Sequence, residues 1–143
     1  MPLPFYAPPE SPVAEPFWDA VRERRLVMPR CSACGRWQWY PDEAGPDCAD
    51  ADYEWVDVAA TGVLHTRTRV HRPFLPGSKD ALPFSVGLIV LDGVEGPRLV
   101  GLLDDDAELA IGDRVRACFV DVDGDVRPLF GPEAEATRDS VTP

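Results

Sequence analysis

The sequence predicts a mainly β protein with one N-terminal helix, a small ribbon that carries cysteines, and a small barrel or sandwich of five strands. Three observations lead to this prediction. Helical spacing is found near the N-terminus, a Cys-x-x-Cys-Gly segment follows it, and short apolar runs separated by turn residues fill most of the rest. Strands without helices between them favour a barrel or sandwich. A chain of 143 residues with 45% hydrophobic content holds one domain or two small ones.

Residues 1–29 are expected to form a proline-rich arm followed by a helix. Residues 1–12 are rich in proline, which lacks an amide donor, so we expect an extended arm that is either disordered or laid on a partner. Residues 13–28 are predicted to be helical, and Pro29 is expected to prevent continuation. The positions at spacings of three and four are Phe17, Trp18, Val21 and Arg25, with Leu26 and Val27 closing the apolar edge.

Residues 30–55 contain half of a zinc knuckle. Cys31 and Cys34 stand two residues apart on a turn that Gly35 closes, but the second half reads Gly45-Pro46-Asp47-Cys48, with glycine at the first ligand position. A structural zinc site has four ligands. The candidate metal ligands are therefore Cys31, Cys34 and Cys48. Two outcomes stay open: Asp47 or Glu43 completes the site with an oxygen, or the metal is lost and packing holds the knuckle.

The other cysteine and the aromatic residues after the knuckle favour structural roles. Cys118 lies in a predicted strand far from the knuckle and is expected to be a small buried residue. Trp37 and Trp39 are expected to point the same way on a strand. At least one ring of Trp37, Trp39 and Tyr40 should fill the ribbon's small core, and the others should face a partner.

Five strands are predicted within residues 56–132, followed by a polar, loose tail at 133–143. The strand rich in apolar residues at 83–91 should be central, and its Gly87 indicates a bend or bulge. Asp123-Gly124 indicates a hairpin. The predicted strands are residues 56–72, 83–91, 98–103, 114–122 and 125–130.

Charge and hydropathy exclude several protein classes. The net charge of −11 argues against a general nucleic-acid binder, whose affinity comes mostly from neutralising phosphates. No apolar run approaches the length of about 20 residues that spans a bilayer. The N-terminus lacks the basic start and apolar stretch of a signal peptide. We therefore expect a cytoplasmic, reducing location, where a Cys-x-x-Cys pair favours a metal or redox site over a structural disulfide. The βαβ context of a thioredoxin-like redox site is absent, which disfavours the redox role.

The order of motifs resembles a known family, domain of unknown function 35, whose members are acyl-CoA-associated and combine a rubredoxin-like zinc ribbon with an OB-fold. The match runs from about Phe17 to Pro132. In this alignment Cys48 stands at the last ligand position and Gly45 at the third. The markers are Phe17-Trp18, Arg30-Cys31-Ser32-Ala33-Cys34-Gly35, Pro46-Asp47-Cys48, Glu54-Trp55-Val56, Thr61-Gly62-Val63, His71-Arg72-Pro73 and Gly112-Asp113-Arg114-Val115.

The resemblance implies a non-catalytic accessory subunit of a thiolase-superfamily complex that acts on acyl-CoA thioesters. The partner would be a thiolase, an acyltransferase or a retro-aldolase of the lipid-transfer-protein type, and the assembly a two-plus-two heterotetramer. The implied cofactors are zinc and a CoA thioester shared with the partner. Steroid side-chain, aromatic and fatty acyl groups are all compatible with the sequence.

A basic stretch at residues 65–79 is the candidate contact for CoA phosphates or for an acidic partner surface. It carries Arg67, Arg69 and Arg72 without an acid, and on a strand His65, Arg67, Arg69 and His71 would share one face. The alternative is a solvated face balanced by the acids at 104–106, which we expect to form a solvated turn. The adjacent loop at 73–77 is expected to expose Phe74 and Leu75.

The sequence disfavours two other functions. A single-stranded nucleic-acid binder would need a basic groove with stacking aromatics, but residues 56–132 hold 8 basic and 12 acidic residues. An independent hydrolase or acyltransferase would need a nucleophile with its base. The chain has two histidines, His65 and His71, and no Gly-x-Ser-x-Gly motif.

Overall fold

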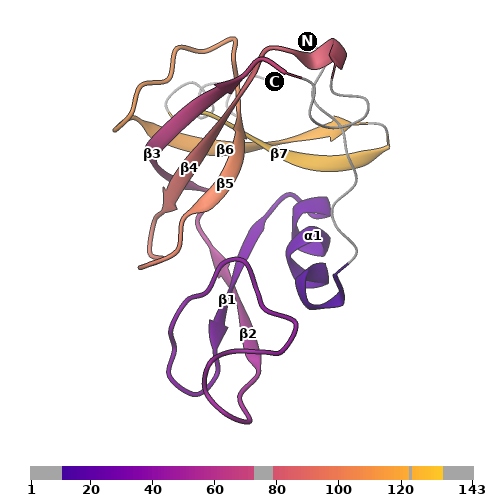
Figure 1. Ribbon diagram of the computed structural model, residues 1–143, viewed down its shortest axis with the longest axis vertical. Helices are drawn as coiled ribbons and strands as arrows, with labels where there is room; N and C mark the ends of the chain where they lie inside the picture. Colours follow the sequence, from indigo (N-terminus) through magenta and orange to yellow (C-terminus); the bar gives the residue numbers. More distant parts are fainter. Residues whose placement is uncertain (1–10, 73–78, 123, 134–143) are drawn as a thin grey trace.

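A computed structural model describes residues 11–72, 79–122 and 124–133. It contains one short α-helix, a two-stranded ribbon and a closed five-stranded barrel, so the expected mainly β fold is confirmed (Figure 1). The predictions for the N-terminal arm at 1–10, for the tail at 134–143, and for Phe74, Leu75 and Asp123 lie outside the described residues.

The N-terminal helix is shorter than the spacing predicted. A 3₁₀ turn at Pro12–Ala14 leads into α1 (Glu15–Arg22), and the backbone then reverses at Arg24, which has a φ of 63°. The prediction of a helix over 13–28 is wrong because Leu26–Cys31 forms strand β1, in which Pro29 pairs with Trp55. Leu26, Val27, Met28 and Pro29 are all buried, and a short, fully buried apolar run reads alike as helix or strand.

The ribbon is completed by β2 (Tyr53–Val58), which runs antiparallel to β1. The predicted single strand over 56–72 is therefore wrong: it is divided at Ala59 and Ala60 between β2 and the first barrel strand. The carbonyl of Ala60 accepts a hydrogen bond of 2.8 Å from the amide of Ala117, which ties this junction to the barrel. The two strands diverge here, and no proline or glycine marks the point in the sequence.

The barrel has the strand order β3-β4-β5-β7-β6, closed by pairing of β6 with β3. Counted along the barrel this is the order 1-2-3-5-4, which confirms the expected OB-fold. The predicted two-residue hairpin is confirmed by the pairing of Val122 with Asp125, and Gly124 takes a φ of 84° there. The strands are β3 (Thr61–Val70), β4 (Phe84–Leu91), β5 (Leu99–Leu103), β6 (Arg114–Val122) and β7 (Asp125–Pro132).

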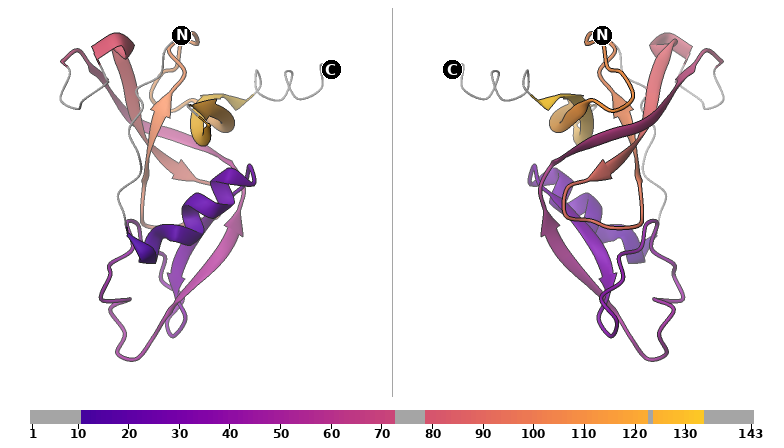
Figure 2. Two further views of the ribbon diagram at one scale, coloured as in Figure 1. Left: turned by 90° about the vertical axis from the view of Figure 1, so that its right-hand side faces the viewer. Right: turned by 90° about the vertical axis from the view of Figure 1, so that its left-hand side faces the viewer.

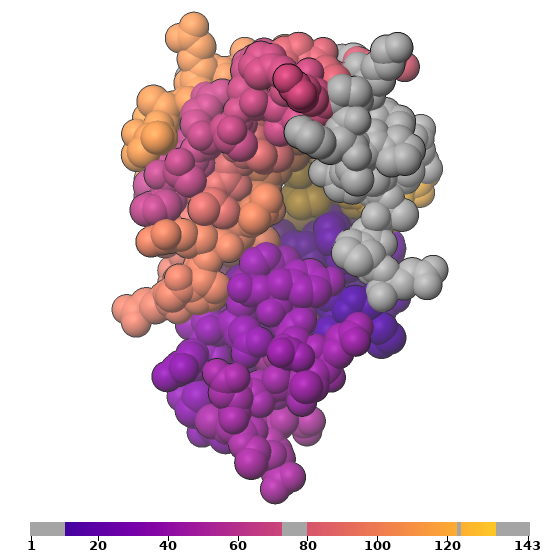
Figure 3. Space-filling model, viewed as in Figure 1, coloured from indigo at the N-terminus to yellow at the C-terminus, as the bar shows by residue number. Residues whose placement is uncertain are grey.

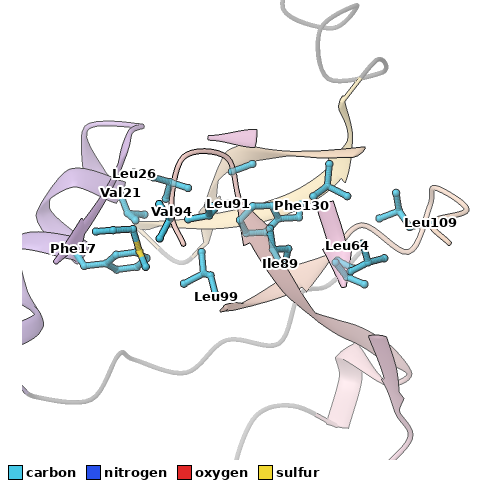
Figure 4. Close-up of a cluster of buried hydrophobic side chains, with 14 residues drawn as sticks. Phe17, Val21, Leu26, Leu64, Ile89, Leu91, Val94, Leu99, Leu109 and Phe130 are labelled. Carbon is cyan, nitrogen blue, oxygen red and sulfur yellow. The ribbon is translucent and has the colours of Figure 1, made fainter. Parts of the chain in front are cut away.

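One hydrophobic core joins the helix, the ribbon and the barrel. Phe17 and Val21 of α1 and Leu26 of β1 pack with Leu91 and Leu99 of the barrel (Figure 4). The helix lies against β1 and β7 (Figure 2), and the Arg22 guanidinium reaches Asp125 at 3.1 Å. The ribbon is therefore fixed to the barrel through a shared apolar interior.

Gly87 is required for close approach. A Cβ atom there would lie 2.6 Å from Leu64 Cδ1 and 3.2 Å from Leu103 Cδ1, inside the barrel. The register shift lies between Leu64 and Thr66 of β3, so the bulge predicted at Gly87 belongs to the partner strand, at His65. Glycine on β4 and the extra residue on β3 allow the sheet to curve tightly here.

An ion-pair cluster closes one end of the barrel and predicts sensitivity to acid. Asp92 accepts hydrogen bonds from Arg114 at 2.6 and 2.8 Å and from the Thr61 hydroxyl at 2.6 Å. The bonds from Arg114, then the bond from Thr61, lower the pKa of Asp92 to about 2. The Asp92 carboxylate is therefore harder to protonate in the folded state than in the unfolded chain. Its contribution to the stability of the fold is fully present above about pH 4.

We expect the free energy of unfolding to fall as the pH is lowered from about 4 to about 2, and Asp92→Asn to reduce this dependence. The carboxylate is partly exposed, so its share should not exceed about 1 kcal/mol. Urea midpoints measured at several pH values between 5 and 2 check this. Equal slopes for the wild type and Asp92→Asn would contradict the assignment to Asp92.

Candidate metal centre and partner surface

Cys31, Cys34 and Cys48 come together at the tip of the ribbon. Cys31 is the last residue of β1, and its carbonyl accepts a 2.8 Å hydrogen bond from the amide of Gly35, whose φ is 76°. This tight turn returns Cys34 toward Cys31. Cys48 arrives from the loop between the strands, and the three sulfur atoms lie within 4.8 Å of one another.

The electrostatics of the three thiols suit a metal ion. Backbone amide donation, first from Cys34, lowers the pKa of Cys31 to about 7. The neighbouring sulfurs, first Cys31 and then Cys34, raise the pKa of Cys48 to about 11. Binding of a cation releases thiol protons, because metals bind the thiolate form. Tetrahedral thiolates at about 2.3 Å from zinc lie about 3.8 Å apart, which agrees with this cluster.

The sulfur cluster borders a pocket of about 260 Å³. Gly45 offers no side chain, and its φ of 94° is one that a cysteine rarely adopts. Asp47 borders the pocket, whereas Glu43 does not. Among His, Cys, Asp and Glu of the described residues, the three cysteines alone bring their ligand atoms together here. The pocket is lined by the three cysteines with Arg36, Gln38, Pro46 and Asp47.

Cys118 takes no part in this cluster. It is half-buried on β6, where it pairs with Leu129 of the neighbouring strand β7. The expectation that Cys118 is a small buried residue is wrong, because it is only half-buried.

The aromatic residues after the knuckle divide between the core and the surface. Trp39 packs on Phe17 with ring centroids 4.6 Å apart, and Trp37 lies under the guanidinium of Arg30 at 5.4 Å. Both tryptophans contact the core, while Tyr40 is exposed. The expected strand over these residues is wrong, since Trp37 forms only an isolated bridge with Arg30.

The predicted row of basic side chains is only partly formed. Because His65 occupies the bulge and His71 lies beyond the end of β3, Arg67 and Arg69 alone share the face that pairs with Gly87 and Ser85. That is the inner face of the sheet, where Ser85 is fully buried near the start of β4. The four-residue row predicted by simple alternation is therefore wrong.

Arg67 is engaged in internal bonds. It donates to the Leu109 carbonyl and, at 3.1 Å, to the Ser85 hydroxyl. Asp105 accepts from the Ser85 amide at 3.2 Å and lies 3.6 Å from Arg69, so this acid is not the solvated turn residue we expected. Arg72 is exposed and makes no ion pair with a described residue.

A pocket of about 350 Å³ lies at this end of the barrel. It is bordered by Arg67 and Arg69 but also by Asp105 and Glu108, which offset their charge. The arginines therefore do not form an open anion site by themselves, and Arg72 supplies the unpaired positive charge nearby.

The outer face of β4 and β5 is apolar and continues onto β3 through Val63 and Val70, on either side of Thr66 and Thr68; this surface was not among the sequence-based predictions. Leu88 and Val86 on β4 point outward between their partners on the two neighbouring strands, and Val100 on β5 is 62% exposed. The clue was strand 84–91, which is apolar at nearly every position although a barrel interior uses only alternate residues. The outward apolar residues are Val63, Val70, Phe84, Val86, Leu88, Val90, Val100 and Leu102.

This apolar face reaches the ribbon. Trp37 borders one groove with Val63 and Val90 and a second groove with Glu95, Gly96 and Pro97. Figure 3 shows the ribbon, in purple, directly below the salmon and orange strands of the barrel. Ribbon and barrel thus present one continuous surface.

The described residues do not assemble a nucleophile with its base. His65 and His71 are exposed, and neither pairs with a described acid, serine or cysteine. No helix in the described ranges has the length and apolar character to cross a membrane.

Two family models match consecutive parts of the chain. The rubredoxin-like zinc ribbon domain of ChsH2 matches residues 18–54, and the C-terminal OB-fold domain of ChsH2 matches residues 55–120. A curated relative, the probable enoyl-CoA hydratase alpha subunit of Thermomonospora curvata, is 34% identical over 122 residues. The match takes in 81% of this chain but only 36% of that relative's length.

Solved structures agree with the family models. A chain of the Ltp2-ChsH2(DUF35) aldolase superposes with a TM-score of 0.72 and 29% identity, covering 88% of this chain and 98% of that one. A protein of unknown function of the DUF35 family from Sulfolobus solfataricus shares the fold, with a TM-score of 0.53 and 20% identity over 83% of this chain and 85% of its own. The chain therefore belongs to the domain of unknown function 35 family, with the zinc ribbon and OB-fold arrangement of ChsH2.

Proposed function

We propose that this chain is a non-catalytic accessory subunit of a cytoplasmic enzyme that acts on acyl-CoA thioesters. The partner is an enzyme of the aldolase or thiolase type in a two-plus-two heterotetramer, and the ribbon holds zinc, which stabilises it. The likeness to nearly the whole of one chain of the Ltp2-ChsH2(DUF35) aldolase supports a place beside an aldolase-type enzyme. The likeness to a subunit with an enoyl-CoA hydratase name supports the acyl-CoA substrate class.

The apolar outer face of β3, β4 and β5 is the observation that carries this proposal. A strand with one face in water alternates apolar and polar side chains, whereas the outward positions of β4 and β5 are all apolar, with Thr66 and Thr68 beside them on β3. Val100 is exposed, and the outward residues of β4 are half-buried. Large exposed apolar patches in proteins mark interaction sites. We assign the occupant of this face to the enzyme subunit, because the matching aldolase chain belongs to a two-protein assembly and spans the same two modules.

The same face argues against a single-stranded nucleic-acid binder. Such proteins track the phosphate backbone with a basic groove and stack bases on aromatic rings. Here the outward positions of β4 and β5 carry one aromatic side chain, Phe84, and no lysine or arginine.

Of Arg67, Arg69 and Arg72, predicted to contact the CoA phosphates, Arg69 and Arg72 remain the proposed direct contacts. Because Arg67 already bonds to Leu109 and Ser85, we propose that it positions the loop at 104–113 while Arg69 and Arg72 meet the phosphates. The weak 3.6 Å contact of Arg69 with Asp105 leaves Arg69 free to turn toward an anion.

Val100→Lys is expected to weaken binding of the enzyme partner by about 30-fold or more, because it places a charge in an apolar interface. The chain, carrying an affinity tag, is used to capture its partner from the native organism, and the captured complex is assayed for acyl-CoA turnover. Ile111→Lys is the matched control, since Ile111 is 63% exposed but lies on the loop between β5 and β6.

Loss of the acyl-CoA-active partner with Val100→Lys and its retention with Ile111→Lys would support the proposal. Retention with both variants would contradict it. If the free wild type is a dimer that Val100→Lys dissociates, while partner capture is unchanged, the face belongs to a second copy and the assignment is wrong.

A further inference from the structure

The cysteine cluster is open on one side. Cys31 is buried, Cys48 is half-buried, and Cys34 is exposed at the edge of the 260 Å³ pocket. A ligand can therefore approach the three sulfurs from the side of Cys34 without displacing the core.

No cysteine is available for the fourth coordination position of a tetrahedral site. The backbone at Gly45 has the left-handed φ that disfavours a cysteine, so the second half of the knuckle has lost both the ligand and the conformation for one. The carboxylate of Asp47 borders the pocket but does not join the group of converging ligand atoms. Metal sites closed by four protein ligands are structural, whereas those with three protein ligands keep a position for water or substrate.

We propose that Cys31, Cys34 and Cys48 leave one coordination position of their metal exchangeable, and that a small aliphatic thiol binds there as its thiolate. This inference rests on the metal centre of the proposed function. In the exchange, a bound water leaves, a sulfur–metal bond forms and the thiol proton passes to solvent. No electron is transferred.

Three features favour a thiol over other small molecules. Three thiolates select thiophilic ions, which prefer a further sulfur to an oxygen. Arg36 lines the pocket and makes no ion pair with any described residue, so its positive charge offsets that of the added thiolate. The pocket volume of about 260 Å³ lies just below the range of drug-sized sites, so it fits a short chain.

Cobalt spectroscopy of the full chain tests the proposal. The protein is loaded with Co²⁺, and its visible d–d and thiolate-to-cobalt bands are recorded during titration with N-acetylcysteamine. The alcohol analogue N-acetylethanolamine serves as the control because it replaces only the thiol. We expect a saturable change with the thiol and none with the alcohol. At ten times the thiol's Kd, the apparent Kd for Co²⁺ should fall about tenfold.

The possible failures are distinguishable. If no Co²⁺ binds, the metal centre of the proposed function fails, and this inference fails with it. If Co²⁺ binds with thiolate bands that the thiol does not change, only the exchangeable position is overturned. The variant Asp47→Asn tests whether Asp47 occupies the fourth coordination position. Equal thiol responses in wild type and variant support the proposal. A response that appears only in Asp47→Asn would make Asp47 the fixed fourth ligand and overturn the proposal.

Discussion

Cys34→Ala is expected to lower metal affinity by far more than the roughly 10- to 100-fold that loss of a residue supporting a ligand costs. It removes one of three converging thiolates and leaves Cys31 and Cys48, too few ligands to hold zinc against water. Because small metal modules gain much of their folding free energy from the ion, the ribbon should also melt at lower temperature. Metal content and competition with a chelator measure the affinity.

Tryptophan fluorescence reports on the helix, the ribbon and the core that they share with the barrel, because all four tryptophans precede residue 56 and pack against that core. Cys118→Ala is the control, since it removes a thiol from the barrel and should leave metal content unchanged. An identical tryptophan melting curve for Cys34→Ala and wild type would show that no ion stabilises the ribbon.

Gly62→Ala is expected to destabilise the barrel by about 3 kcal/mol, which lowers the Tm by about 10 °C. Gly62 lies between Leu91 of β4 and Val115 of β6, at the point where the barrel closes. A Cβ atom there would overlap the carbonyl oxygen of Val90 and lie 3.0 Å from the Leu91 Cα. Both are backbone atoms, so the clash cannot be relieved by turning a side chain.

Gly131→Ala is the matched control for this substitution. Gly131 is also buried in the barrel, but its added Cβ would meet nothing closer than 3.8 Å, at Asp104. Thermal unfolding followed by far-UV circular dichroism compares the two variants. A Tm for Gly62→Ala within 2 or 3 °C of that for Gly131→Ala would contradict the close approach of β3 and β4.

The sequence predicted the fold class and the barrel strands after residue 83 to within about two residues, because glycine and aspartate mark the turns between them. It failed where such residues are missing. The apolar run Leu26–Pro29 is compatible with either a buried helix or a buried strand, so the sequence pattern does not distinguish them. The structure shows a strand that is buried in the core. The break at Ala59 and Ala60 depends on the divergence of ribbon and barrel, which is a tertiary feature.

In the candidate site, too, the sequence predicted local features and missed those that depend on tertiary contacts. Cys-x-x-Cys spacing is local, so the convergence of Cys31 and Cys34 could be expected, and the resemblance supplied Cys48. The bulge at His65, which changes the direction of the basic side chains, depends on pairing with β4. The hydrogen bond from Arg67 to the Leu109 carbonyl connects residues 42 positions apart, and strand alternation cannot predict such a contact.

The central claim is that this chain contributes binding surface and stability to acyl-CoA chemistry performed by another subunit. The most direct test is turnover of a panel of acyl-CoA thioesters by the purified chain, by the purified partner and by the two together. We predict no turnover by the chain alone, and activity of the mixture that exceeds that of the partner alone and is lost with Val100→Lys. Turnover of an acyl-CoA thioester by the chain without a second protein would contradict the claim.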